Sequence, residues 1–388
     1  MKKIISLVLL LSLILSVFGL GVSASELNPA RTFAREQIER IAAEPDENNI
    51  WSEETSIKSE FVLYDLENVP NSYIYNLVTN GKDTGYIQID VLDGVYSVHS
   101  YSFDGTNEVF HMLQQIGQTN TPGVLSADTF GKVYYLGQSA YAIEKDGQLL
   151  DLYTDEAITV DRKDLKKGYN EFVASMKIPQ ISPQASITSG STMITNYKNF
   201  TLADMDDFKG KTIVGGHSTV VDKHCTPTAG TNVVKYYAKC RGKSALYAGS
   251  DWNTFKALYL AMDTNGVNYS FDGKWTGTYW DITHSDGYSG LLNYINARGV
   301  PTSDTYRYAL GAVTGISINS IKEQIDKNHP VIMGVKSFPN SDDPSGYHSV
   351  VAFGYKSNMV ILSNGWDKSY HYHNYSSLAV HEYYYIGY

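Results

Sequence analysis

The sequence has no basic segment of the kind that nucleic-acid binding requires. Residues 25–185 hold 12 Lys and Arg against 25 Asp and Glu, and residues 186–388 hold 17 against 16. Without a basic stripe the chain cannot neutralise a phosphate backbone, so nucleic acid is excluded as a partner. The charge asymmetry indicates two separately composed units. Walker and dinucleotide-binding glycine motifs are also missing.

Long apolar runs are equally scarce, since only the run from Ile4 to about Leu20 has that length. It follows the basic start Met1–Lys3 and ends at the small residues Gly21–Ala24, which is the pattern of a secretory signal peptide cleaved after Ala24. An uncleaved anchor is the alternative, because the run is nearly long enough to span a bilayer. We expect a secreted, extracellular monomer that leaves the membrane after signal cleavage.

Cysteine is rare, with Cys225 and Cys240 as the only two. In an exported protein two cysteines first suggest a disulfide. If the residues between them are helical, however, 15 positions correspond to roughly 20 Å, whereas a disulfide needs Cα atoms within about 7 Å. We therefore expect two free thiols, and a free thiol in an exported chain suggests a chemical role.

Cys225 stands where a loop is predicted to turn into a helix. Thr226 and Pro227 suit the first helical turn, and Ala229 and Val233 continue at helical spacing. A thiol at a helix N-terminus meets unpaired N–H groups and the positive end of the helix dipole, and both favour the reactive thiolate. The alternative is a small buried apolar residue, because free cysteine is often buried.

The acidic part, residues 25–177, has the pattern of one helix followed by an antiparallel meander. The helix should begin at Asn28–Pro29 and end before Pro45. Asn80–Gly81 and Asp93–Gly94 indicate hairpin turns, because both turn residues must tolerate positive φ. Strands are expected at 61–64, 73–78, 86–91 and 95–98, with a later hairpin at 134–136 and 141–143 and a helix at 161–176.

Residues 178–197 are rich in Pro, Ser and Gln and are predicted to form an extended, protease-accessible linker. The remaining residues, 198–388, have helices first and antiparallel strands second, which describes an α+β domain. Helices are expected to begin at Cys225, at Ser250, at Asp286 or Ser289, and at Ser317. Strands are expected at 330–335, 348–355, 359–363 and 382–386.

His348 and Asn364 are the residues that could activate Cys225. His348 lies 123 residues and Asn364 139 residues after the cysteine, near the spacing of about 130–150 in papain-type enzymes. A thiol nucleophile needs a base within hydrogen-bond reach and a third group that orients the base. A hairpin at 356–358 would pair their strands, so His348 Nδ1 could donate to the Asn364 side-chain oxygen. Asp367 is the alternative orienting residue.

The run from Cys225 to Tyr237, together with Tyr347–Val351 and Asn364–Trp366, resembles papain-like cysteine peptidases of clan CA. It is similar in particular to the bacteriocin-leader-processing peptidases and their secreted relatives. The resemblance covers roughly residues 200–388. It implies that Cys225 is the nucleophile, His348 the base and acid, Asn364 the orienting residue, and Trp366 the aromatic that shields them. It further implies a helical part opened by the cysteine helix and an antiparallel β half-barrel.

The helix and meander of residues 25–177 resemble the pro-domain of streptopain-like bacterial peptidases, so the resemblance implies a zymogen inhibited by its own N-terminal domain. An independent binding or adhesion module is the alternative. One departure from the family concerns the glutamine that donates to the oxyanion a few residues before the cysteine. No Gln lies between Gln184 and Cys225, and His217, Ser218 and Thr219 are the replacement candidates.

No cofactor and no metal are expected. His99 and His111 are isolated in the sequence, and His371 and His373 have no third ligand at useful spacing, so the latter pair is expected in a solvent-exposed loop. Three functions stay open: a cysteine peptidase acting on protein or peptide substrates, a Cys–His amidase or wall-peptide hydrolase, and a catalytically impaired binding protein.

Overall fold

The computed structural model describes residues 28–116, 131–137, 140–153, 157–176, 190–268, 277–279, 285–309, 316–336 and 347–388. The predicted signal peptide, 1–24, and residues 178–189 of the predicted linker lie outside the described residues. The last residues of the predicted linker are part of the fold. They contain the short strand β8 (Thr192–Met193), which pairs with β13 (Tyr347–Lys356).

The described residues contain seven α-helices, and none of these is long and apolar enough to cross a membrane. They are α2 (Pro29–Ala42), α3 (Glu108–Gln115), α5 (Arg162–Met176), α6 (Cys225–Cys240), α7 (Asp251–Ala261), α8 (Asp286–Ala297) and α9 (Ile318–Asp326). Asn28, Ser250 and Ser285 accept hydrogen bonds from first-turn amides, which fixes where α2, α7 and α8 begin. The sequence patterns predict every one of these helices except α3.

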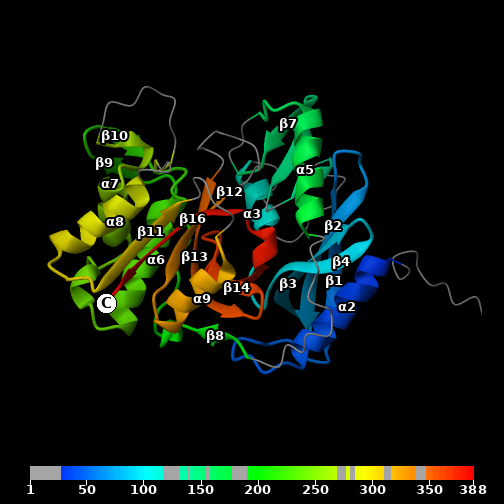
Figure 1. Ribbon diagram of the computed structural model, residues 1–388, viewed down its shortest axis with the longest axis horizontal. Coiled ribbons are helices and arrows are strands. Elements are labelled where there is room, and N and C mark those ends of the chain that lie inside the picture. The colour runs from blue at the N-terminus through cyan, green and yellow to red at the C-terminus, as the bar shows by residue number, and fades with distance from the viewer. Residues whose placement is uncertain are drawn as a thin grey trace, which may run out of the picture.

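One sheet of 14 strands runs through the described part of both halves of the chain (Figure 1). Its order is β11-β16-β12-β13-β14-β15-β4-β3-β2-β1-β5-β6-β7, with β8 beside β13, and β9 (Thr212–Val214) and β10 (Ser218–Val220) form a separate pair. The strands not yet given are β1 (Thr55–Tyr64), β2 (Pro70–Thr79), β3 (Lys82–Leu92), β4 (Val95–Ser102), β5 (Val133–Tyr135), β6 (Tyr141–Lys145), β7 (Gln148–Asp151), β11 (Asp304–Ala309), β12 (Val331–Lys336), β14 (Met359–Ser363), β15 (His371–Asn374) and β16 (Val380–Gly387).

The predicted meander is confirmed as β1 to β4, joined in antiparallel order. Asn80 and Gly81 adopt φ of 52° and 76°, and Asp93 and Gly94 adopt 49° and 75°. Two successive residues with positive φ give the turn whose twist matches the flanking strands. The two hairpin signals therefore place the turns of the β2–β3 and β3–β4 pairs, and one bulge shifts the register farther along each pair.

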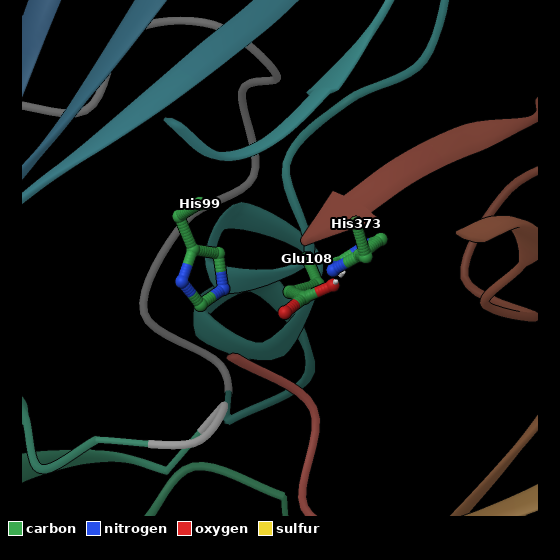
Figure 2. Close-up of side chains that lie close together, drawn as sticks. All are labelled: His99, Glu108 and His373. Atoms are coloured by element: carbon green, nitrogen blue, oxygen red, sulfur yellow. Dashed lines mark ion pairs between the residues drawn. The ribbon is translucent and has the colours of Figure 1, made fainter. Parts of the chain in front are cut away.

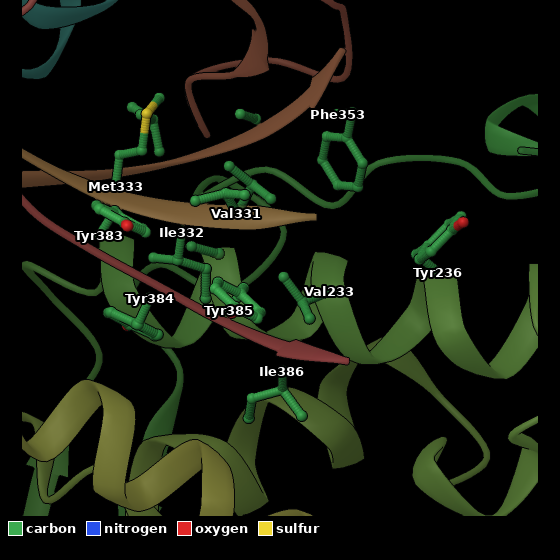
Figure 3. Close-up of a cluster of buried hydrophobic side chains, with 14 of the residues drawn as sticks. Val233, Tyr236, Val331, Ile332, Met333, Phe353, Tyr383, Tyr384, Tyr385 and Ile386 are labelled. Atoms are coloured by element: carbon green, nitrogen blue, oxygen red, sulfur yellow. The ribbon is translucent and has the colours of Figure 1, made fainter. Parts of the chain in front are cut away.

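Helix α6 packs on the C-terminal half of the sheet (Figure 3). Its Val233 and Tyr236 belong to one buried cluster with apolar residues of β12, β13 and β16. In that sheet Met333 lies opposite Tyr383 and Val331 opposite Tyr385. Because the cysteine is the first residue of α6, this packing sets the position of its thiol relative to β13.

The two halves of the chain meet edge to edge. Tyr372 and His373 of β15 pair with Tyr101 and Ser100 of β4, and the rings of Tyr101 and Tyr372 stack at 4.5 Å. Lys356 of β13 makes a buried ion pair of 2.7 Å with Glu44, just after α2. The N-terminal strands thus extend the sheet of the C-terminal half.

Candidate active site

Cys225 is the first residue of α6, and His224 occupies the cap position before it. The His224 ring is anchored to the Met205 carbonyl through Nε2 at 2.9 Å. Cys225 and Cys240 are both free and stand at opposite ends of the helix. The prediction that the two do not form a disulfide is confirmed.

His348 is the second residue of β13 and is buried, with 5% of its surface exposed. It forms a hydrogen bond with the Cys225 side chain. Its Nε2 lies 2.6 Å from the backbone oxygen of Asn364, just after β14. The expected bond from Nδ1 to the Asn364 side chain is therefore wrong, because the backbone carbonyl takes Nε2 and leaves Nδ1 for the thiol.

The Asn364 side chain makes a hydrogen bond within its own loop and not with His348. Its Oδ1 accepts a hydrogen bond from the Trp366 backbone N–H at 3.1 Å, while its buried Nδ2 has no partner among the described residues. This bond places the Trp366 ring parallel to His348, with centroids 5.3 Å apart and planes 17° apart. Trp366 is thus placed to shield the imidazole, as the resemblance implies.

The predicted alternative, Asp367, points elsewhere. Its carboxylate accepts from His371 Nε2 at 2.8 Å and from the Thr106 backbone at 2.9 Å. It therefore connects β15 to the N-terminal half, and the structure records no contact between it and His348.

The electrostatics of the pair favour charge separation. Burial opposes ionisation of the Cys225 thiol, but the hydrogen bond and charge of His348 outweigh it and lower the thiol pKa to about 7. The Ser349 backbone N–H adds a further donor to the sulfur. Burial likewise opposes the charged form of His348, yet Cys225 and the Asn364 carbonyl raise its pKa. A thiolate beside an imidazolium is the nucleophilic form of such a pair.

A cavity of about 690 Å³ includes Cys225 and His348 in its wall. Of the three oxyanion candidates only Thr219 lines this cavity, and its hydroxyl is engaged with Tyr259. His217 and Ser218 do not belong to the wall. The segment before the cysteine therefore offers little in place of the absent glutamine.

Tyr384 of β16 supplies a donor that the sequence patterns did not indicate. Tyr384 belongs to the cavity wall, and its buried hydroxyl has no hydrogen-bond partner among the described residues. A Cβ at Gly287 would lie 2.7 Å from this hydroxyl and 2.9 Å from the Thr226 methyl group, so the phenol lies close to the residue after the nucleophile. Burial first, and the Glu382 and Cys225 charges next, raise the pKa of Tyr384 well above its usual range and keep the hydroxyl protonated.

The N-terminal half contributes a further part of the wall through Gln115, Ile116, Leu152 and Tyr153. The Tyr153 ring lies 5.5 Å from the His348 ring and 6.1 Å from that of Trp366. No sequence pattern indicated this contact, because Tyr153 is more than 190 positions from either partner.

The histidines outside the site differ from expectation. His371 and His373 are not in an exposed loop but on β15, with 0% and 2% of their surface exposed. His99 is equally buried at 0%, and its ring centroid lies 6.1 Å from that of His373. The prediction failed because the strand pairing that buries these residues joins segments more than 270 positions apart.

The comparisons with known proteins concern the family to which the chain belongs. Residues 195–388 match the model of the Peptidase_C39 like family, and a search of the curated proteins finds no match. A solved structure described as a C39-like peptidase from Bacillus anthracis shares 13% identity, with a TM-score of 0.27, over 46% of this chain and 98% of that chain. The family match spans half of the 388 residues and contains Cys225, His348 and Asn364. The chain belongs to the Peptidase_C39 like family of cysteine peptidases.

Proposed function

We propose that the chain hydrolyses peptide bonds, with the Cys225 thiolate as nucleophile and His348 as general base and acid. The observation that carries this proposal is the Cys225–His348 hydrogen bond in the wall of the cavity, with the thiol pKa at about 7. Attack of the sulfur on the peptide carbonyl gives a tetrahedral oxyanion. The His348 imidazolium then protonates the leaving amine, and the neutral ring later takes a proton from the water that releases the acyl group.

Stabilisation of the oxyanion is assigned to two donors. One is the Cys225 backbone N–H, at the N-terminus of α6. The other is the hydroxyl of Tyr384, a residue of the cavity wall; this hydroxyl has no partner among the described residues and stays protonated. Asn364 holds the His348 ring through its backbone carbonyl, and Trp366 excludes water from the other side of the ring.

The proposal includes secretion and synthesis as a zymogen. Secretion is supported by the pattern of residues 1–24. Zymogen control is supported by the N-terminal half in the cavity wall, where Tyr153 contacts His348. Cleavage within 179–195 would break the peptide link between the two halves of the chain. N-terminal sequencing of the processed fragment should then give a first residue in that range.

A thiol-directed epoxide tests the catalytic proposal. The wild-type chain should be labelled at Cys225 and should hydrolyse casein or a peptide library, whereas Cys225→Ala should do neither. Labelling and hydrolysis both missing from processed and unprocessed protein would overturn it. Amine release without chain cleavage, or activity on wall peptides alone, would identify an amidase or wall-peptide hydrolase with the same residues.

A catalytically impaired binding protein is the second candidate. It is favoured by the absence of Gln before Cys225 and by the Asn364 side chain, which bonds to the Trp366 backbone and not to His348. In that case Cys225 would titrate near the ordinary thiol pKa of about 8.5 and show no excess reactivity.

A further inference from the structure

A second group of buried titratable side chains lies where the N-terminal strands join the sheet of the C-terminal half. It consists of His99 on β4, Glu108 at the start of α3 and His373 on β15, with 0%, 3% and 2% of their surfaces exposed. One nitrogen or oxygen atom of each lies within 4.8 Å of the other two. Figure 2 shows the Glu108 carboxylate between the two imidazoles.

His373 is the unusual member of this group. Both of its ring nitrogens are buried and lack a hydrogen-bond partner among the described residues. Its Nε2 lies 3.6 Å from Glu108 Oε2, which is too long for a hydrogen bond. Buried polar atoms almost always have a partner, so two unpaired ring nitrogens indicate a ligand that is not one of the described side chains.

His99 is oriented by a carboxylate behind it. Its Nδ1 lies 2.9 Å from Asp90 Oδ2, and the same carboxylate accepts from the Tyr135 hydroxyl at 3.1 Å and from Ser72 at 2.8 Å. A proton on Nδ1 leaves the lone pair on Nε2, away from Asp90, where the Tyr141 hydroxyl lies at the long hydrogen-bond distance of 3.5 Å and would have to be displaced by a metal ion. This carboxylate–histidine arrangement is the usual support of a metal-binding imidazole.

We propose that His99, Glu108 and His373 bind a divalent transition metal ion, with zinc as the best match. Two imidazoles and one carboxylate form a zinc ligand set, with bonds of about 2.0–2.2 Å. Tetrahedral geometry then separates ligand atoms by about 3.3 Å. Since the three atoms lie within 4.8 Å of one another, no pair has to approach by more than about 1.5 Å. Water would take the fourth position. This proposal departs from the expectation, from the sequence, that the chain binds no metal.

The ligands come from both halves of the chain, which gives the ion a structural role. His99 and Glu108 belong to the N-terminal half and His373 to the C-terminal half, next to the β15–β4 pairing. A bound ion would therefore hold α3 and β4 against β15. This inference does not depend on the proposed peptidase activity.

Metal titration of the full chain with Cys225→Ala tests the proposal, because that substitution prevents the Cys225–His348 pair from binding metal. Cobalt(II) should give visible d–d absorption that saturates at one equivalent. Zinc should displace cobalt with micromolar or tighter affinity, and it should raise the thermal midpoint of unfolding. Absence of tight binding to this protein would overturn the proposal.

Variants in the same background locate the ion. Glu108→Gln and His373→Gln should each weaken binding at least about 100-fold, and Asp90→Asn by about 10–100-fold, as loss of a supporting carboxylate typically does. His111→Gln is the matched control, because it removes a histidine from the same helix without removing a ligand, and it should leave affinity unchanged. Circular dichroism confirms that each variant is folded. Binding that persists in both Glu108→Gln and His373→Gln would contradict the site.

Discussion

Cys225 and Cys240 begin and end the same helix, yet their surroundings drive the two thiols in opposite directions. Burial opposes ionisation of both. At Cys225 the His348 side chain overcomes it and lowers the pKa to about 7, whereas at Cys240 burial dominates and raises the pKa to about 11. Arg241 only partly offsets burial at Cys240. Reactivity here is therefore a property of the partner and of the helix end, and not of the residue type.

Removing His348 should have the largest effect, because the difference between the two thiols depends on it. His348→Ala should lower kcat/KM for a peptide substrate by at least about 10⁴-fold, because the ion pair and the proton donor for the leaving group are lost together. Steady-state hydrolysis by equal amounts of folded protein measures this loss. His329→Gln is the control, since it changes a buried histidine remote from the cavity wall, and it should stay within about twofold of wild type. Equal losses in both variants would indicate a folding defect.

Alkylation sharpens the comparison directly. At pH 7.5 a thiol with pKa about 7 is mostly ionised, whereas one with pKa about 11 is almost wholly protonated. Iodoacetamide should therefore modify Cys225 about 20–60-fold faster than Cys240, because a Brønsted coefficient of about 0.4–0.5 makes the more basic thiolate intrinsically more nucleophilic and offsets part of the difference in ionisation. Peptide mapping by mass spectrometry gives the two rates.

The pH dependence of that reaction has a definite sign. Because its pKa is lowered to about 7, the Cys225 thiol is mostly ionised above that pH. The rate of Cys225 alkylation should therefore fall as the pH drops through 7. His348→Gln should move the midpoint upward, because the hydrogen bond and charge that stabilise the thiolate are removed. A midpoint near 8.5 in the wild type would contradict the ion pair.

A substitution at Tyr384 tests whether its hydroxyl is the second oxyanion donor beside the Cys225 backbone N–H. Tyr384→Phe removes only the hydroxyl and should lower kcat about 10²-fold with little change in KM, as expected for loss of one oxyanion donor. Tyr383→Phe is the matched control, because neighbouring residues of a strand face opposite sides of the sheet. Initial rates over a range of substrate concentrations give the two parameters separately. An equal effect of both substitutions would assign the loss to packing.

The sequence predicted what depends on neighbours along the chain. The turns at Asn80–Gly81 and Asp93–Gly94, and the position of Cys225 at a helix start, follow from local backbone chemistry and are confirmed. The order of Cys225 and His348 sufficed to propose their partnership, because the spacing of the two residues resembles that of a known arrangement. Which His348 nitrogen meets Asn364, and whether through backbone or side chain, depends on the loop at Trp366 and had no signal in the spacing.

Features built across the two halves were missed for a physical reason. β15 is short and rich in histidine, so its sequence lacks an apolar alternation, and only pairing with β4 makes it a buried strand. The burial of His373 therefore depends on segments that no local pattern connects to it. The same holds for Tyr384 and Tyr153, whose roles appear only when the cavity wall is assembled.

Tyr153 offers the smallest and most selective change to the Cys225 end of the helix. Ring contacts of this kind are worth about 0.5–1.5 kcal/mol, which corresponds to roughly 2–10-fold in rate. If the ring covers His348, Tyr153→Ala should raise both the alkylation rate of Cys225 and kcat/KM of the full chain by that factor, while Cys240 is unchanged. Tyr153→Phe keeps the ring and should resemble wild type. A lower kcat/KM together with faster alkylation would instead assign Tyr153 to the substrate-binding surface, because the substrate would then depend on contact with this ring.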